Sequence, residues 1–130
     1  MRRIISTQVL NPFGANNMTG TAIVTSNPIE TYPFDLNEMS FEVQWTGTPT
    51  GTLTIEGSSQ YDPVNNPGAT FITISTSSLI FPLPVNPTGA PGSLLTLFAR
   101  PGVSKWVRWR YVNTSGTGQL SIWAFGKGRN

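Results

Sequence analysis

The residues best suited to chemistry in this 130-residue chain lie between Lys105 and Tyr111, where basic and aromatic side chains interleave. In an extended strand alternate side chains point to opposite faces, so Trp106, Arg108 and Arg110 share one face. The other face is apolar or aromatic and holds Val107, Trp109 and Tyr111. A face with one Trp and two Arg suits a protein interface, a nucleic-acid backbone or a stacked ring.

Three interpretations of this strand stay open. In the first, its apolar face fills the core while the Arg stems cover Trp106 and pair with acids of other strands. In the second, Arg108 and Arg110 contact phosphates and Trp106 stacks on a base. In the third, the same three side chains anchor a contact with another protein. A carbohydrate site that uses Trp106 or Trp123 as a stacking platform is a further alternative.

Charge is segregated along the sequence. All six acids lie between Glu30 and Asp62, and all eight bases lie near the two ends. Residues 4–99 hold six acids and no base, a charge of −6, whereas residues 100–130 hold six bases and no acid, a charge of +6. Such blocks either meet within one fold or pair an acidic face of one copy with a basic face of the next. Because six acids can neutralise six bases internally, nucleic-acid binding is the least supported interpretation.

Catalytic chemistry has few groups to use. The chain has no His and no Cys, which removes the commonest general base, the commonest metal ligand and the thiolate nucleophile. The best paired carboxylates, Glu42 and Glu56, fall on the outer faces of predicted strands rather than in a cleft. Asp62 lies in a loop without calcium-loop spacing. We therefore expect no enzyme, no bound metal and no cofactor.

Strand patterns run through the chain, and helix periodicity is almost absent. Residues 39–45 alternate without a fault and, with residues 52–56, predict one hairpin; residues 105–112 and 119–125 predict another. Four further runs read as strands: Ile4 to Leu10, Thr21 to Thr25, Phe71 to Ser75 and Leu94 to Ala99. About eight short strands predict an all-β, antiparallel β-sandwich or jelly roll that forms a single domain over residues 1–130.

One loop differs from the others in composition. Residues 81–92 contain four prolines, which favour a stiff, extended chain. The loop also carries Phe81, Leu83 and Val85, which a solvated linker does not need. It therefore either wraps over the end of its own sandwich or docks on a neighbour.

The chain shows no signal for export or for a membrane. Arg2 and Arg3 resemble the charged start of a signal peptide, but the apolar run that follows ends after Ile5. No apolar stretch approaches the roughly 20 residues of a membrane helix. We expect a soluble protein that is made in a cytoplasm and does not contact a membrane.

Several segments together resemble small β-sandwich virion proteins of tailed bacteriophages. The segments are 41–58, with its Thr-Gly-Thr-Pro turn, the Trp-Val-Arg strand at 106–111 and the Ser-Gly-Thr-Gly hairpin at 115–122. The chain departs from that pattern after Ser58, where residues 59–63 replace an Asn-Asp-Gly-like loop. The resemblance implies a structural component of a phage particle, such as a capsid decoration protein or a tail or fibre subunit, and it carries over no catalytic or ligand residue.

Our hypothesis from the sequence is a non-enzymatic capsid decoration or cement protein, made in the bacterial host and resident in the virion. Its expected partners are copies of itself and other virion proteins, and salt should weaken that association. The alternative is a carbohydrate-binding fibre or adhesin module that uses an exposed Trp. The expected interface residues come from both ends, the proline-rich loop and the last strands: Arg2, Arg3, Phe81, Leu83, Val85, Trp106, Arg108, Arg110, Trp123, Lys127 and Arg129.

Overall fold

The chain folds entirely into strands and loops over the residues that the computed structural model describes, which are 4–30, 36–74, 86–98 and 106–128. This confirms the predicted all-β class. The strands are β1 (Ile4–Leu10), β2 (Ile23–Thr25), β3 (Ile29–Glu30), β4 (Leu36–Trp45), β5 (Thr50–Ser58), β6 (Ile72–Thr73), β7 (Gly92–Phe98), β8 (Trp106–Ser115) and β9 (Leu120–Gly128).

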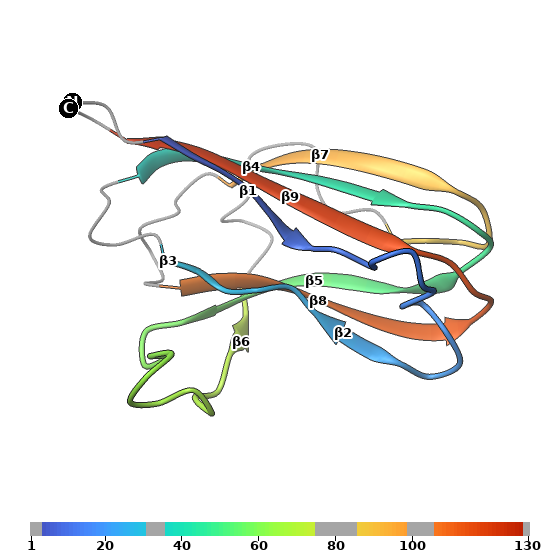
Figure 1. Cartoon of the computed structure of the whole chain (residues 1–130), viewed down its shortest axis with the longest axis horizontal. Coiled ribbons are helices and arrows are strands. Elements are labelled where there is room, and N and C mark those ends of the chain that lie inside the picture. Colours follow the sequence, from blue (N-terminus) through green and yellow to red (C-terminus); the bar gives the residue numbers. More distant parts are fainter. Residues whose placement is uncertain (1–3, 31–35, 75–85, 99–105, 129–130) are drawn as a thin grey trace.

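Two antiparallel sheets form the layers of a sandwich (Figure 1). One sheet has the order β1-β9-β4-β7, and the other has the order β2-β8-β5-β6, with β3 paired to β8 beside β2. The pairs β1 with β9, β2 with β8, β4 with β7 and β5 with β6 nest inside one another along the chain. When these nested pairs fold over into two sheets, β4 also pairs with β9 and β5 also pairs with β8. This connectivity is that of a jelly roll.

Both predicted hairpins are wrong, although all four of their strands exist. The chain leaves β4 in one sheet and enters β5 in the other, and it crosses in the same way from β8 to β9. Alternation fixes which face of a strand is buried but not which strand pairs with it, so the sequence pattern of a hairpin and of an inter-sheet arch is the same. The two arches pair with each other: the Thr46 amide donates to Gln119 O at 3.0 Å and the Thr48 amide to Thr117 O at 2.9 Å.

The core lies between the sheets and contains the faces that alternation predicted to be buried. From β4 and β8 the largest buried side chains are Phe41, Trp109 and Tyr111. The Phe41 and Trp109 rings meet edge to face, with centroids 5.7 Å apart and an interplanar angle of 82°, and so join the two sheets. The rest of the cluster includes Val9, Met18, Met39, Val43, Leu53, Ile55, Val107, Leu120 and Ile122.

The end of the proline-rich loop folds onto its own sandwich. Residues 75–85, with the predicted Phe81, Leu83 and Val85, lie outside the described residues. Beyond them, Asn86 Oδ1 accepts the Leu53 amide at 2.9 Å and Pro49 O accepts the Gly89 amide at 2.7 Å. Trp45 Nε1 donates to Ala90 O at 2.9 Å. This part of the loop therefore closes the arch between β4 and β5.

Candidate functional site

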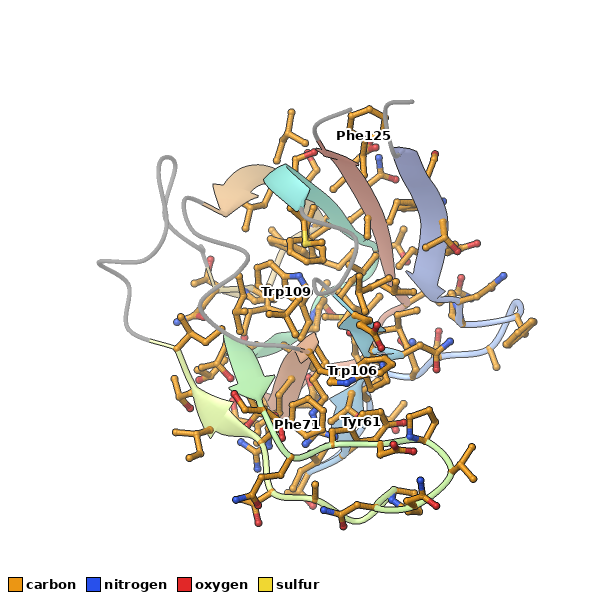
Figure 2. The ribbon with its side chains drawn as sticks, turned by 90° about the vertical axis from the view of Figure 1, so that its left-hand side faces the viewer. Tyr61, Phe71, Trp106, Trp109 and Phe125 are labelled. Atoms are coloured by element: carbon orange, nitrogen blue, oxygen red, sulfur yellow. The ribbon has the colours of Figure 1, made fainter. Side chains whose placement is uncertain are left out.

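The predicted Trp–Arg strand is β8, and the end of its outer face is covered by the loop between β5 and β6. Trp106 is half-buried because the Tyr61 ring meets it edge-on, with centroids 5.0 Å apart. Tyr61 also contacts the Phe71 ring at 5.3 Å. Figure 2 shows the three rings gathered beside β8, while Trp109 points into the interior. Trp106 is thus part of a packed aromatic cluster and is not a free stacking platform.

Arg108 belongs to the same cluster. Its Nε lies 3.0 Å from Glu56 Oε1 on the neighbouring strand β5, and its Cζ lies 3.9 Å from the centre of the Phe71 ring. Glu56 is only 7% exposed, so the carboxylate that pairs with Arg108 is largely shielded from water. The structure therefore favours the interpretation in which β8 fills the core and its Arg pairs with an acid, with Tyr61 instead of the Arg stems covering Trp106.

The charge segregation also has an explanation within one fold. Strands β4 and β5 come from the acidic segment, and their partners β9 and β8 come from the basic end. In addition to the Glu56–Arg108 pair, the backbone register sets Glu38 opposite Lys127. Contacts between copies are not needed to bring the two blocks together.

A second surface lies on the outer face of the other sheet, where a hollow of about 390 Å³ opens to solvent. Its lining combines aromatic, aliphatic, acidic, amide and hydroxyl side chains, from Ser6, Ser40, Glu42, Gln44, Leu95, Trp123, Ala124 and Phe125. Trp123, the second Trp considered as a stacking platform, therefore lies in a solvent-accessible surface of polar and apolar side chains.

The strand register explains why this hollow forms. Gln8, Trp123, Glu42 and Leu95 lie directly opposite one another in a row across β1, β9, β4 and β7. In the next row, Phe125 lies between two small residues, Ser6 on β1 and Ser40 on β4. The small serines leave space between larger side chains. Gln44 Nε2 donates to Glu42 Oε1 at 2.9 Å and so orients the carboxylate in the middle of the row.

A third feature is the loop between β1 and β2, which presents Phe13 to solvent. This side chain is 88% exposed and has a φ of 54°, in the left-handed region. Asn11 Oδ1 accepts the Phe13 amide at 2.8 Å, and Pro12 O accepts the Ala15 amide at 3.1 Å. Bulky side chains are rare in this conformation, which is unfavourable by about 1–2 kcal/mol. The loop therefore holds an apolar side chain in a strained position where it contacts water.

The predicted interface residues that the structure describes lie on both sheets. Arg2, Arg3, Phe81, Leu83, Val85 and Arg129 lie outside the described residues. Trp106, Arg108 and Arg110 lie on the outer face of one sheet, and Trp123 on that of the other. The backbone of Lys127 pairs with Ile4 and Glu38 in the same sheet as Trp123.

Sequence reasoning missed Phe13, Leu95, Phe125 and Tyr61. The only local signal for Phe13 is the turn sequence Asn11-Pro12-Phe13-Gly14, in which an aromatic residue occupies a position that turns usually give to polar residues or glycine. No sequence pattern singled out Leu95 or Phe125 as a site residue, because each occupies an ordinary position in the alternation of its strand. Their exposed fractions are 60% and 48%.

Buried polar groups near the arches serve the fold. The Tyr111 hydroxyl donates to Asn113 Oδ1 at 2.7 Å, and Asn113 Nδ2 donates to Gly20 O at 3.0 Å and to Gly116 O at 3.1 Å. Burial raises the pKa of the Tyr111 phenol above its ordinary value. These bonds tie the loop before β2 to the arch between β8 and β9.

Two kinds of site are absent over residues 4–30, 36–74, 86–98 and 106–128. No group of three or more acidic, His or Cys side chains is placed to hold a metal ion. No helix in these segments is long and apolar enough to cross a membrane.

Comparison of the chain with protein families, with curated proteins and with solved structures finds no match.

Proposed function

We propose that this chain is a non-enzymatic structural component of a bacteriophage virion, a capsid-associated decoration or cement protein that acts through protein–protein contacts. The observation that carries the proposal is the strand order β1-β9-β4-β7 facing β2-β8-β5-β6. This jelly-roll order recurs in viral capsid domains, and it agrees with the resemblance of segments 41–58, 106–111 and 115–122 to phage virion proteins.

The composition separates this function from the metal-dependent and hydrolytic uses of the fold, such as those of the cupins. A hydrolytic or metal-dependent jelly roll needs acid–base groups or metal ligands. The chain has neither His nor Cys, and over the described residues no three acidic side chains are grouped to hold a metal ion. Its partners would be copies of itself and other virion proteins, and its location would be the particle.

Phe13 is the side chain that we assign to the contact with the particle. The Asn11 side chain holds the left-handed conformation of Phe13 by accepting its amide, and strained residues held in this way cluster at functional sites. Large aromatic residues are also preferred anchors of protein interfaces. The segregated charges of the sequence led us to expect that salt would weaken this association. Because an aromatic anchor would dominate the contact and Glu56 pairs with Arg108 internally, we instead propose that salt weakens particle binding only slightly.

Binding to particles that lack the protein tests this proposal. Purified protein would be sedimented with particles of a phage whose own copy of the gene is deleted, and the bound copies would be counted. We expect saturation at a fixed copy number, with Phe13→Ser weakening the binding about tenfold. Val64→Ser is the matched control, since Val64 is 82% exposed in the loop between β5 and β6, at the opposite end of the sandwich (Figure 1).

Two outcomes would contradict the proposal at different levels. Protein that stays in the supernatant at every concentration contradicts the role in the virion. Saturable binding that Phe13→Ser and Val64→Ser leave equally strong contradicts only the assignment of Phe13.

A further inference from the structure

The hollow on the outer face of β1-β9-β4-β7 is built from side chains that the proposed virion role does not use. Its centre is the cross-strand pair of Trp123 and Glu42, and Leu95 continues that row on β7. Phe125 stands in the next row, between Ser6 and Ser40. Trp123 is half-buried, whereas Leu95 and Phe125 are 60% and 48% exposed. The hollow therefore offers interleaved apolar and polar side chains to the same ligand.

We infer that this hollow is a binding site for a neutral sugar ring. A pyranose has a face of C–H groups, which stacks on an aromatic ring, and a rim of hydroxyl groups, which need both donors and acceptors. Trp123 and Phe125 provide the aromatic surface, and the Glu42 carboxylate accepts hydrogen bonds from hydroxyls. Gln44 and the serines Ser6 and Ser40 add donors and further acceptors.

The orientation of Glu42 is set before any ligand arrives. Gln44 Nε2 donates to Glu42 Oε1 at 2.9 Å, and both residues lie on the outer face of β4. A carboxylate held in this way loses less conformational freedom when it binds a hydroxyl than a free side chain would. We assign Glu42 as the sugar-binding acceptor and Gln44 as its positioning residue.

The charge and size of the hollow narrow the class of ligand. Glu42 is the single charged side chain in its described lining, so an acidic sugar or a phosphate would be repelled. A purely apolar ligand would leave the carboxylate and the hydroxyls without partners. A volume of about 390 Å³ lies within the range of roughly 300–1,000 Å³ that small-molecule pockets occupy.

An organic cation is the strongest competing ligand, because it can also pair with a carboxylate and an aromatic ring. Such sites surround the cation with aromatic faces and have no use for a hydroxyl lining. Here serines flank Phe125, and an amide donor already engages Glu42. These groups suit a ligand with several hydroxyls.

The experiment is a glycan array probed with the fluorescently labelled full-length chain, followed by calorimetric titration of the strongest neutral hit. Choline and N-acetylneuraminic acid serve as the cationic and acidic probes. We expect a neutral pyranose to bind, and Trp123→Ala and Glu42→Ala each to weaken the binding about tenfold or more. Gln44→Ala should weaken it less than Glu42→Ala does.

Two further variants keep the test decisive if Trp123→Ala does not fold. Ser40→Leu fills the hollow without touching the core and should also abolish binding. Trp106→Ala removes the half-buried Trp of the opposite sheet and should leave the affinity unchanged. Circular dichroism of every variant establishes that it is folded.

The inference is overturned if the folded wild type binds no neutral glycan, or if it binds choline or the acidic sugar in preference. It is also overturned if Ser40→Leu binds as well as the wild type, or if Trp106→Ala alone abolishes binding. These outcomes leave the virion role untouched, because particle binding depends on a different surface and is measured without glycan.

Discussion

Arg108 Nε lies 3.0 Å from Glu56 Oε1, and the two residues face each other across β8 and β5. The pair joins the basic end of the sequence to its acidic middle. Because the Arg108 Cζ also lies 3.9 Å from the centre of the Phe71 ring, the pair helps to hold the loop between β5 and β6 against the sheet.

Removing Arg108 should destabilise the fold. In Arg108→Met the Glu56 carboxylate, in a residue only 7% exposed, loses its cation, and we expect the free energy of unfolding to fall by about 1–3 kcal/mol. Adding Glu56→Gln to this variant should recover part of the loss, because the unpaired charge is then gone. Urea denaturation at neutral pH measures both.

Arg110→Met is the matched control for this pair. Arg110 lies two residues further along the same face of β8 and makes no ion pair within the described part of the chain. Its replacement should change the free energy of unfolding by no more than about 0.5 kcal/mol. Equal losses in Arg108→Met and Arg110→Met would show that the pair with Glu56 contributes nothing.

Alanine substitutions at Gly47 and Gly14 distinguish the cost of backbone strain from the cost of steric crowding. Both have a left-handed φ, +80° and +79°. An added Cβ at Gly47 would collide with Thr117 O and with Gly118 Cα in the other arch, whereas at Gly14 it would meet nothing within 4 Å. Gly14→Ala should therefore lose only about 1–2 kcal/mol of stability from its backbone conformation.

Gly47→Ala should lower the free energy of unfolding by about 1–3 kcal/mol more than Gly14→Ala does, which is the usual cost of overpacking. Thermal unfolding followed by circular dichroism measures both variants. If the two lower the melting temperature equally, the arches are not in the close contact described above.

The free energy of unfolding should fall at high pH because of the buried Tyr111 phenol. Its folded-state pKa is raised above the ordinary value of 10.0 by burial, so between these two values the unfolded chain loses its proton first. The contribution of the neutral phenol is fully present below pH 10 and is lost as the pH rises toward the folded-state pKa.

Tyr111→Phe tests this contribution. At neutral pH the variant should be less stable than the wild type by about 1–2 kcal/mol, since Asn113 Oδ1 loses its donor. Above pH 10 the difference should shrink as the pH rises toward the folded-state pKa of Tyr111, which burial raises. Unfolding curves in urea at several pH values measure it, and a difference that does not change with pH would show that Tyr111 does not titrate differently in the two states.

Strict alternation made the inward faces of β4 and β8 predictable. Met39, Phe41, Val43 and Trp45 are all buried, as the period of two requires. The partners of these strands were not predictable, because both candidate hairpins carry glycine-rich turns that serve an arch equally well. The crossing is established by contacts between turns far apart in the sequence, such as the Thr46 amide with Gln119 O.

The candidate sites were predictable only in part. The pattern placed Arg108 on the outer face of its strand, and the acid that it pairs with, Glu56, was expected on an outer face too. The cover over Trp106 was not foreseen, because Tyr61 comes from a loop without periodicity. The surroundings of Trp123 depend on the register of four strands, which no local pattern specifies.

The central claim is that the chain is a stoichiometric part of a virion. Quantitative mass spectrometry of particles purified from a lysate of the host, with the major capsid protein as the internal standard, tests it most directly. We predict a fixed copy ratio to the capsid protein that is the same in independent preparations and survives a wash in high salt. Absence of the chain from purified particles, or a ratio that falls toward zero with repeated purification, would contradict the account.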